Sequence, residues 1–186
     1  MKLTILTLAT AAVLSTSAFA AETNVTGGEV KFTGEFVNAA CSIDMASMNR
    51  TVELGQYSTQ QFPVVAPAVG PVAGLKTANR PFSIVLNDCA TDVQTEAQVG
   101  FNGTTAGNTE QVVVNAPSNK TAATGVAIQI IDSASKAVKV DGSYGDVKTL
   151  QEGQNSFDFN AYYITTGDAL TAGVAHGSVT FMVKYK

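Results

Sequence analysis

Few side chains in this sequence of 186 residues have the chemistry to make or break covalent bonds. It contains two cysteines, Cys41 and Cys89, and one histidine, His176. The cysteines lack the C-x-x-C spacing of redox pairs, and a zinc site needs a larger cluster of such ligands. His176 stands alone in a stretch rich in glycine and alanine, where we expect a solvated turn residue. These residues give no basis for a catalytic or zinc site.

The acidic side chains are dispersed along the chain. Asp141–Asp146 resembles a calcium loop only superficially, because its sixth position is not glycine and its fifth offers no oxygen ligand. No G-x-S-x-G, P-loop or H-E-x-x-H motif is present, and no pair of carboxylates has a spacing that indicates acid–base catalysis. We therefore predict a protein that is not an enzyme, with no catalytic residue, metal, cofactor or small-molecule substrate.

The composition favours an all-β domain. Apolar residues make up 45% of the chain and charged residues 14%, with 11 basic and 15 acidic residues and a net charge of −4. This balance argues against a nucleic-acid partner, since phosphate recognition needs clustered lysines and arginines. Glycine and β-branched residues are plentiful, whereas Glu, Lys and Arg are scarce, and that combination favours strands over helices.

The first twenty residues have the pattern of a secretory signal peptide. A short basic start, Met1–Lys2, precedes an apolar stretch over Leu3–Leu14, and Ala18-Phe19-Ala20 has the small-x-small pattern that precedes cleavage. The apolar stretch is too short to cross about 30 Å of hydrocarbon. We predict cleavage between Ala20 and Ala21, in preference to an N-terminal amphipathic helix of the folded domain.

Export determines how the cysteines are interpreted. In an oxidising compartment Cys41 and Cys89 have no other thiol to pair with, so we predict one disulfide between them. A redox or nucleophilic role for either cysteine is the alternative, and no histidine nearby in the sequence supports it.

The elements that position these residues are a series of short strands. Strict alternation of apolar residues predicts strands with one buried face, and Gly-, Asn- and Asp-rich turns separate them. Strands at this spacing favour a sandwich of two sheets. One apolar stretch, Phe62–Gly74, holds three of the five prolines and is predicted to be a loop lying on its own domain, with packing against a partner as the alternative. The alternating residues are Phe82, Ile84 and Leu86; Val99 and Phe101; Val112–Val114; Val126, Ile128 and Ile130; Phe157, Phe159, Ala161 and Tyr163; and Val179, Phe181, Val183 and Tyr185.

The N-terminal segment Gly28–Phe36 also alternates, with charged or hydroxyl residues on its second face. It can be interpreted as the first strand of the domain's own sheet. The sharper interpretation is a strand that leaves its own domain and completes another sheet by β-augmentation. The residues on its apolar face are Gly28, Val30, Phe32, Gly34 and Phe36.

Several motifs together resemble one protein family. They are G-E-F-V-N-A-A-C-S-I-D over Gly34–Asp44, I-V-L-N-D-C over Ile84–Cys89, a glycine fourteenth from the C-terminus (Gly173) and a penultimate aromatic residue, Tyr185. Phe159–Tyr163 also matches the family's penultimate strand. The chain resembles the major subunits of type 1 fimbriae, in the chaperone–usher pilin family. The interval between the cysteines is longer than in common members, and the extra length falls in the Phe62–Gly74 loop.

The resemblance implies an incomplete immunoglobulin-like β-sandwich that lacks its final strand and is completed by a donor strand from another subunit. It implies a signal peptide over residues 1–20, a donor-strand extension over 21–36 and a pilin domain over 37–186. Expected partners are other pilin subunits in a homopolymer, a periplasmic chaperone and an outer-membrane usher, and the expected location is the extracellular fimbrium, reached through the periplasm. The strand that lines the acceptor groove and meets the chaperone is expected to include Gly173, Val179, Phe181, Val183 and Tyr185.

The expected function is that of a structural pilin subunit, which polymerises by donor-strand exchange into a type 1-like fimbria that mediates cell adhesion. A minor adaptor pilin of the same fibre shares every motif named above. A secreted monomeric β-sandwich that binds carbohydrate or protein, with its first strand closing its own sheet, is the remaining alternative.

Overall fold

The computed structural model describes residues 29–34, 36, 39–64 and 70–186. The chain divides into two units, residues 1–36 and 37–186. The described residues of the first unit, 29–34 and 36, form no strand. The predicted signal peptide with its cleavage site at Ala20 and Ala21, and the predicted donor residue Gly28, lie outside the described residues.

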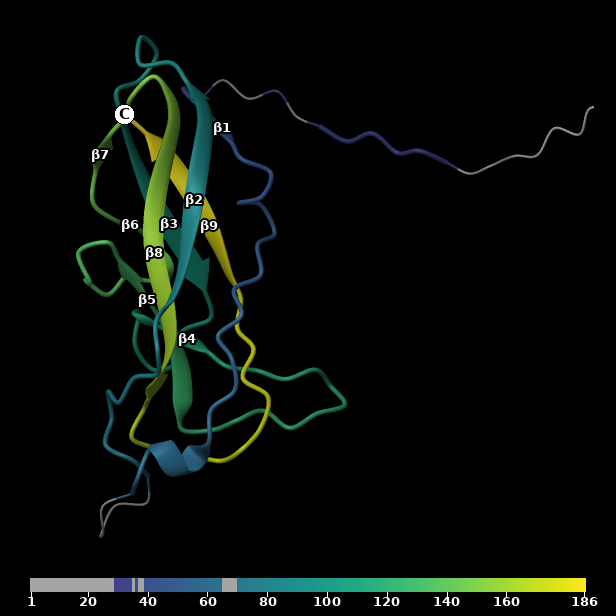
Figure 1. Cartoon of the computed structure of the whole chain (residues 1–186), viewed down its shortest axis with the longest axis vertical. Helices are drawn as coiled ribbons and strands as arrows, with labels where there is room; N and C mark the ends of the chain where they lie inside the picture. The colour runs from purple at the N-terminus through teal and green to yellow at the C-terminus, as the bar shows by residue number, and fades with distance from the viewer. Residues whose placement is uncertain (1–28, 35, 37–38, 65–69) are drawn as a thin grey trace, which may run out of the picture. The chain divides into compact units, whose positions relative to one another are not determined.

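The second unit consists of strands, and its described residues contain one short 3₁₀ turn, η1 (Thr59–Gln61). The strands form two antiparallel sheets, one in the order β1-β2-β8-β5-β4 and one in which β3 pairs with β6, β7 and β9 (Figure 1). Among the described residues, no helix is long and apolar enough to cross a bilayer. The strands are β1 (Ser42–Ile43), β2 (Arg80–Cys89), β3 (Glu96–Gly103), β4 (Gln111–Val113), β5 (Val126–Asp132), β6 (Asp141–Tyr144), β7 (Lys148–Thr149), β8 (Gly153–Thr165) and β9 (Val179–Tyr185).

The main core lies between the two sheets and follows the predicted alternation. β2 pairs with β8 so that Phe82 lies opposite Phe159. Phe101 of β3 meets Phe159 edge to face, with ring centroids 5.0 Å apart, and Phe82 stacks on Phe159 at 5.6 Å. Edge-to-face and offset aromatic pairs stabilise a core beyond the area they bury. The alternating apolar residues of β2, β3 and β8 thus form the contact between the sheets.

A second, smaller cluster covers the outer face of the larger sheet. Ala127, Ile131, Tyr162 and Ile164 are buried there. The Tyr162 hydroxyl donates a hydrogen bond of 2.6 Å to Gln129 Oε1, and the Lys76 ammonium lies 4.8 Å from the Tyr162 ring centroid. Both faces of β5 and β8 are therefore buried along part of their length, whereas the alternation predicted burial on one face alone.

The proline-rich loop packs on its own domain in its described part. Pro71 is fully buried, and the Val72 carbonyl accepts a hydrogen bond of 2.6 Å from Thr165 Oγ1. A Cβ added to Gly70 would lie 2.1 Å from the Asp168 carbonyl oxygen, so only glycine allows this approach. These contacts agree with the prediction that the loop lies on its own domain; residues 65–69 lie outside the described part.

Cys41 and Cys89 form the predicted disulfide, which closes a sequence separation of 48 residues. Cys41 immediately precedes β1 and Cys89 ends β2, so the bond joins two antiparallel neighbours at the edge of the larger sheet. Both cysteines are buried. His176 is exposed as predicted, but the prediction of a turn is wrong: its backbone is extended and exchanges hydrogen bonds with Asn115.

Candidate functional site

Strand β9 is an edge strand whose backbone faces an open side. Among the described residues it pairs with β3 alone, Val99 opposite Val183. At the end of this pair Glu96 and Lys186 donate hydrogen bonds to each other's carbonyls, at 3.1 and 2.9 Å. Antiparallel partners alternate between bonded and non-bonded pairs, so every second residue from Tyr185 points its N–H and C=O away from β3. Those residues are Val179, Phe181, Val183 and Tyr185.

The same four residues turn their side chains toward the core without being covered. All four pack against the main cluster, yet each is only partly buried. The equivalent inward residues of β3, Val99 and Phe101, are 3% and 1% exposed. A strand that presents half-covered apolar side chains and an unpaired backbone edge lacks a neighbour on that side.

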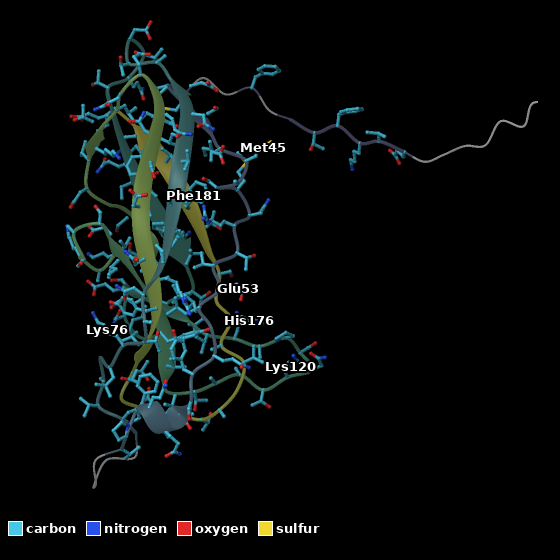
Figure 2. All side chains as sticks on the ribbon, in the orientation of Figure 1. Met45, Glu53, Lys76, Lys120, His176 and Phe181 are labelled. Carbon is cyan, nitrogen blue, oxygen red and sulfur yellow. A yellow bond between two sulfur atoms is a disulfide. The ribbon has the colours of Figure 1, made fainter. Side chains whose placement is uncertain are left out.

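Residues 50–57 form the opposite wall. This segment has no regular secondary structure, and none of its residues makes a backbone–backbone hydrogen bond to another described residue. Leu54 belongs to the main core and Val52 packs against it, as the β9 side chains do. Figure 2 labels Glu53 on this segment and Phe181 on β9. We use the name open groove for the unpaired edge of β9 together with the core-packing residues 50–57.

A tyrosine closes each end of the open groove. At one end the Tyr185 hydroxyl donates a hydrogen bond of 3.3 Å to the Cys41 carbonyl. At the other end the Tyr163 hydroxyl donates a hydrogen bond of 2.7 Å to the Ala175 carbonyl, and its ring meets Tyr57 edge to face at 6.1 Å. These contacts hold Cys41 beside Tyr185, and Tyr57 near the residues that precede β9, so the chain from Cys41 to Tyr57 runs in the direction opposite to β9.

Burial raises the pKa of both tyrosines above the ordinary 10.0. For Tyr163 the neighbouring Tyr57 and Glu53 raise the pKa further, because each would repel a phenolate. Both hydroxyls therefore remain protonated donors across the range in which bacteria live. In this structure the two hydroxyls bind backbone carbonyls next to the groove, and neither has the lowered pKa of a catalytic base.

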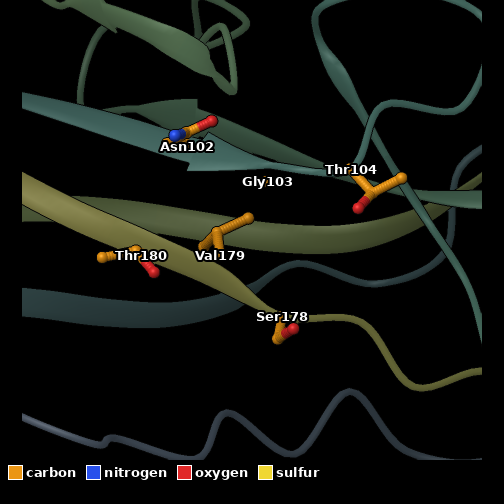
Figure 3. Close-up of a pocket in the computed structure, with 6 residues that line it drawn as sticks. All are labelled: Asn102, Gly103, Thr104, Ser178, Val179 and Thr180. Carbon is orange, nitrogen blue, oxygen red and sulfur yellow. The ribbon is translucent and has the colours of Figure 1, made fainter.

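The hollow nearest to the groove offers no chemistry of its own. It lies where β3 and β9 diverge, has a volume of about 400 Å³, and is lined by backbone and small side chains (Figure 3). None of its lining residues is titratable near neutral pH; they are Asn102, Gly103, Thr104, Ser178, Val179 and Thr180. In the described part of the chain, no three His, Cys, Asp or Glu side chains lie close enough to hold a metal ion.

A family model described as "Fimbrial protein" matches residues 30–186, which include the whole sandwich and both walls of the open groove. The chain belongs to this fimbrial family. It is 40% identical to the "Fimbrial subunit type 1" of Salmonella typhimurium over 100% of this chain and 98% of that protein. The fimbrial family consists of structural subunits, so this chain is a structural pilin of the extracellular fimbrium.

Solved structures of pilus subunits share the fold of this pilin. The P pilus rod subunit PapA aligns with a TM-score of 0.66 at 24% identity, over 80% of this chain and 100% of that one. A subunit from a chaperone–usher pilus, in a structure that concerns rod uncoiling, aligns with a TM-score of 0.69 at 25% identity, over 90% of this chain and 100% of that one. The predicted fold class is confirmed: an all-β, immunoglobulin-like pilin domain.

The structure places Gly173 differently from the four alternating residues of β9. This glycine precedes the strand, in a stretch that pairs with residues 115–124 of the pilin. A Cβ on Gly173 would lie 2.4 Å from the Ala123 backbone nitrogen, which no side chain tolerates. Gly173 therefore permits two backbone segments to approach closely just before the groove begins.

The described residues of the predicted donor segment expose their apolar side chains. Val30, Phe32 and Phe36 are 75%, 89% and 106% exposed, and nothing lies within 4 Å of a Cβ added to Gly34. Sequence reasoning missed the second wall of the groove and the role of Tyr163. Val52 and Leu54 alternate, and that signal could have identified the wall, but the run is short and Gly55 ends it.

Proposed function

We propose that this pilin polymerises by donor-strand exchange, in which residues 21–36 of one copy fill the open groove of another. Its role is structural rather than catalytic. The donor face consists of Gly28, Val30, Phe32, Gly34 and Phe36, and the acceptor edge is β9, with Val179, Phe181, Val183 and Tyr185. Gly173 contributes by letting the chain enter this edge.

The observation that carries the proposal is the missing backbone hydrogen bonds of β9 and of residues 50–57. Among the described residues, β9 has a backbone partner on one side only, and residues 50–57 make no backbone–backbone hydrogen bond at all. Each main-chain hydrogen bond made by an inserted strand would stabilise the complex by about 0.5–1.5 kcal/mol. The segment that offers alternating apolar residues, 29–34 with Phe36, has them exposed. A head-to-tail match of this kind does not close on itself and generates a filament.

The same groove provides a reason for a chaperone. An uncovered apolar groove with an open strand edge promotes aggregation, so the subunit needs a temporary strand before assembly. We propose that a periplasmic chaperone supplies this strand along β9, and that an outer-membrane usher is where the next subunit replaces it. Export through the periplasm would use the signal peptide over residues 1–20, with cleavage between Ala20 and Ala21.

Deleting residues 21–33 from the mature chain tests the proposal. The groove remains intact, so the variant should still be captured by the chaperone and should form no fibres. A control variant that lacks only residues 22–26 retains the alternating segment and should polymerise. Fibres of normal length from the 21–33 deletion, measured by electron microscopy of the cell surface, would refute donor-strand exchange.

Electron microscopy also separates the alternatives. A major subunit accounts for the length of the fibre, so deleting it should remove thin surface fibres altogether. A minor adaptor pilin shares the groove and the donor segment, and its loss should leave fibres of the major subunit. A monomeric binding module should leave no fibre phenotype at all.

A further inference from the structure

The outer face of β9 carries one charge close to the end of the groove. The side chains that alternate with the groove residues are Thr180, Met182 and Lys184, and Lys184 is exposed. Its ammonium lies 5.5 Å from the ring centroid of Tyr144 on β6, across β3 from the open edge, so an ion pair with an inserted strand would replace this contact. A strand inserted beside β9 would place one of its own outward side chains directly opposite Lys184.

Tyr185 restricts which residue can lie opposite the end of β9. Its side chain reaches from β9 to the residue that precedes β1, where the hydroxyl donates a hydrogen bond of 3.3 Å to the Cys41 carbonyl. A side chain on an inserted strand at this level would collide with the ring, so a glycine is required there. On the apolar face of the donor segment, the glycines are Gly28 and Gly34.

Two arrangements place a glycine opposite Tyr185 and still pair most of the segment with β9. In the antiparallel one, Gly28 lies at Tyr185, and Val30, Phe32 and Gly34 follow down the groove. In the parallel one, Gly34 lies at Tyr185 and the order is reversed. The other two combinations carry most of the segment beyond the end of β9. Lys184 faces Glu29 in the antiparallel arrangement and Thr33 in the parallel one.

The length of chain between Phe36 and Cys41 decides which arrangement is possible only between two copies and not within one. In the antiparallel arrangement Phe36 lies beside Gly177, about 26 Å along the strand from Tyr185. Cys41 of the acceptor is held at Tyr185. The five steps from Phe36 to Cys41 span at most about 18 Å, so a chain cannot fill its own groove in this direction. The parallel arrangement places Phe36 beside Cys41 and permits self-insertion.

We infer that Glu29 of one subunit pairs with Lys184 of the next, and that this ion pair favours the antiparallel, intersubunit register over self-insertion. The inference rests on the proposed donor-strand exchange. Opposite charges directly across two strands favour a register by about 1.5- to fivefold, and like charges disfavour it by a similar factor. Glu29 and Lys184 therefore act as a specificity pair on the outer face, where they do not disturb the apolar contacts inside the groove.

A charge-exchange cycle on full-length subunits tests the pair. Fibres of wild type, Glu29→Lys, Lys184→Glu and the double variant are collected, and the rate of subunit release in guanidinium is compared. Each single variant loses the attraction and gains a like-charge pair, so it should dissociate about two- to 25-fold faster than wild type, and the double variant should recover most of the loss. High salt should reduce these differences. Effects of the two substitutions that simply multiply would overturn the inference.

A matched cycle identifies the direction of the strand. Thr33→Lys combined with Lys184→Glu should show no such recovery in the antiparallel register, where Thr33 faces Thr180. Recovery in this cycle and none with Glu29 would establish the parallel register and overturn the inference. The loss of the Lys184–Tyr144 contact is common to both cycles and cancels.

Cross-linking provides a readout that does not depend on energies. A Thr33→Cys, Thr180→Cys subunit should give a ladder of covalent oligomers on a non-reducing gel, whereas Thr33→Cys, Lys184→Cys should not. A ladder from the second variant alone would overturn the inference. If the wild-type chain forms no fibres, the failure lies in donor-strand exchange itself; fibres without charge coupling refute the ion pair alone.

Discussion

Phe32→Ala should weaken the fibre strongly while leaving the subunit unaffected. In the described unit Phe32 is 89% exposed, so its removal takes no buried contact from the isolated chain. In an occupied groove it would lie opposite Phe181, which packs on the core but is only partly covered. Burying a phenylalanine side chain stabilises by about 1.5–3 kcal/mol. At 1.4 kcal/mol for each factor of ten, the loss corresponds to about ten- to 150-fold faster release per interface.

The assay follows the release of subunits from purified fibres. Fibres sheared from cells are diluted into guanidinium, and the monomer fraction is measured by size-exclusion chromatography over time. Lys31→Ala is the matched control, because it changes the adjacent residue on the outward face. Equal release rates for wild type and Phe32→Ala would refute the assignment of Phe32 to a groove. An equal effect of both substitutions would refute the alternation of faces.

Three further predictions concern the domain itself. Cys41→Ser should lower the yield of folded subunit, because the disulfide closes 48 residues and is worth about 4 kcal/mol on the chain-entropy model; a periplasmic extract with undiminished folded pilin would contradict this. Tyr185→Ala should weaken capture by the chaperone, which a pull-down from periplasm measures against Lys186→Ala as control. Burial raises the pKa of Tyr163 and of Tyr185 above 10.0, so their contribution to stability is complete below about pH 10 and is lost as the pH rises through the folded-state values. Tyr163→Phe should therefore make the free energy of unfolding fall less steeply with pH above about pH 10. An unchanged slope would show that the pKa of this phenol is the same in the folded and unfolded states.

Alternation in the sequence predicted which side chains face the core. Phe82, Ile84 and Leu86 on β2, and Phe157 and Phe159 on β8, line the contact between the sheets as expected. Periodicity reports the buried face of a strand because the side chain's environment selects its polarity. It performed less well on β5, whose run V-A-I-Q-I-I-D is nearly continuous in apolar residues. There Ala127 and Ile131 lie under a second cover that no local pattern indicated.

Which strands lie at the edge of a sheet was harder to predict than which side chains face the core. Every strand carries the same backbone donors and acceptors, so the sequence of β9 does not show whether one side or both sides are paired. The family resemblance supplied the expectation of a missing strand. The opposite wall at residues 50–57 could not be found in this way, since it becomes recognisable only when the backbone hydrogen bonds of its neighbours are known.

An open strand edge binds without selectivity unless something else restricts the incoming strand. Main-chain hydrogen bonds alone would accept any extended peptide, and most proteins hide such edges for that reason. Here the open edge belongs to β9, with the hydrogen bond from Tyr185 to Cys41 at one end and the one from Tyr163 to Ala175 just before its other end. In the proposed donor-strand exchange, an incoming strand therefore carries a glycine at the Tyr185 level and apolar side chains at alternate positions along β9. We propose that selectivity comes from Tyr185 and the half-covered core, while the backbone edge supplies affinity that does not depend on sequence.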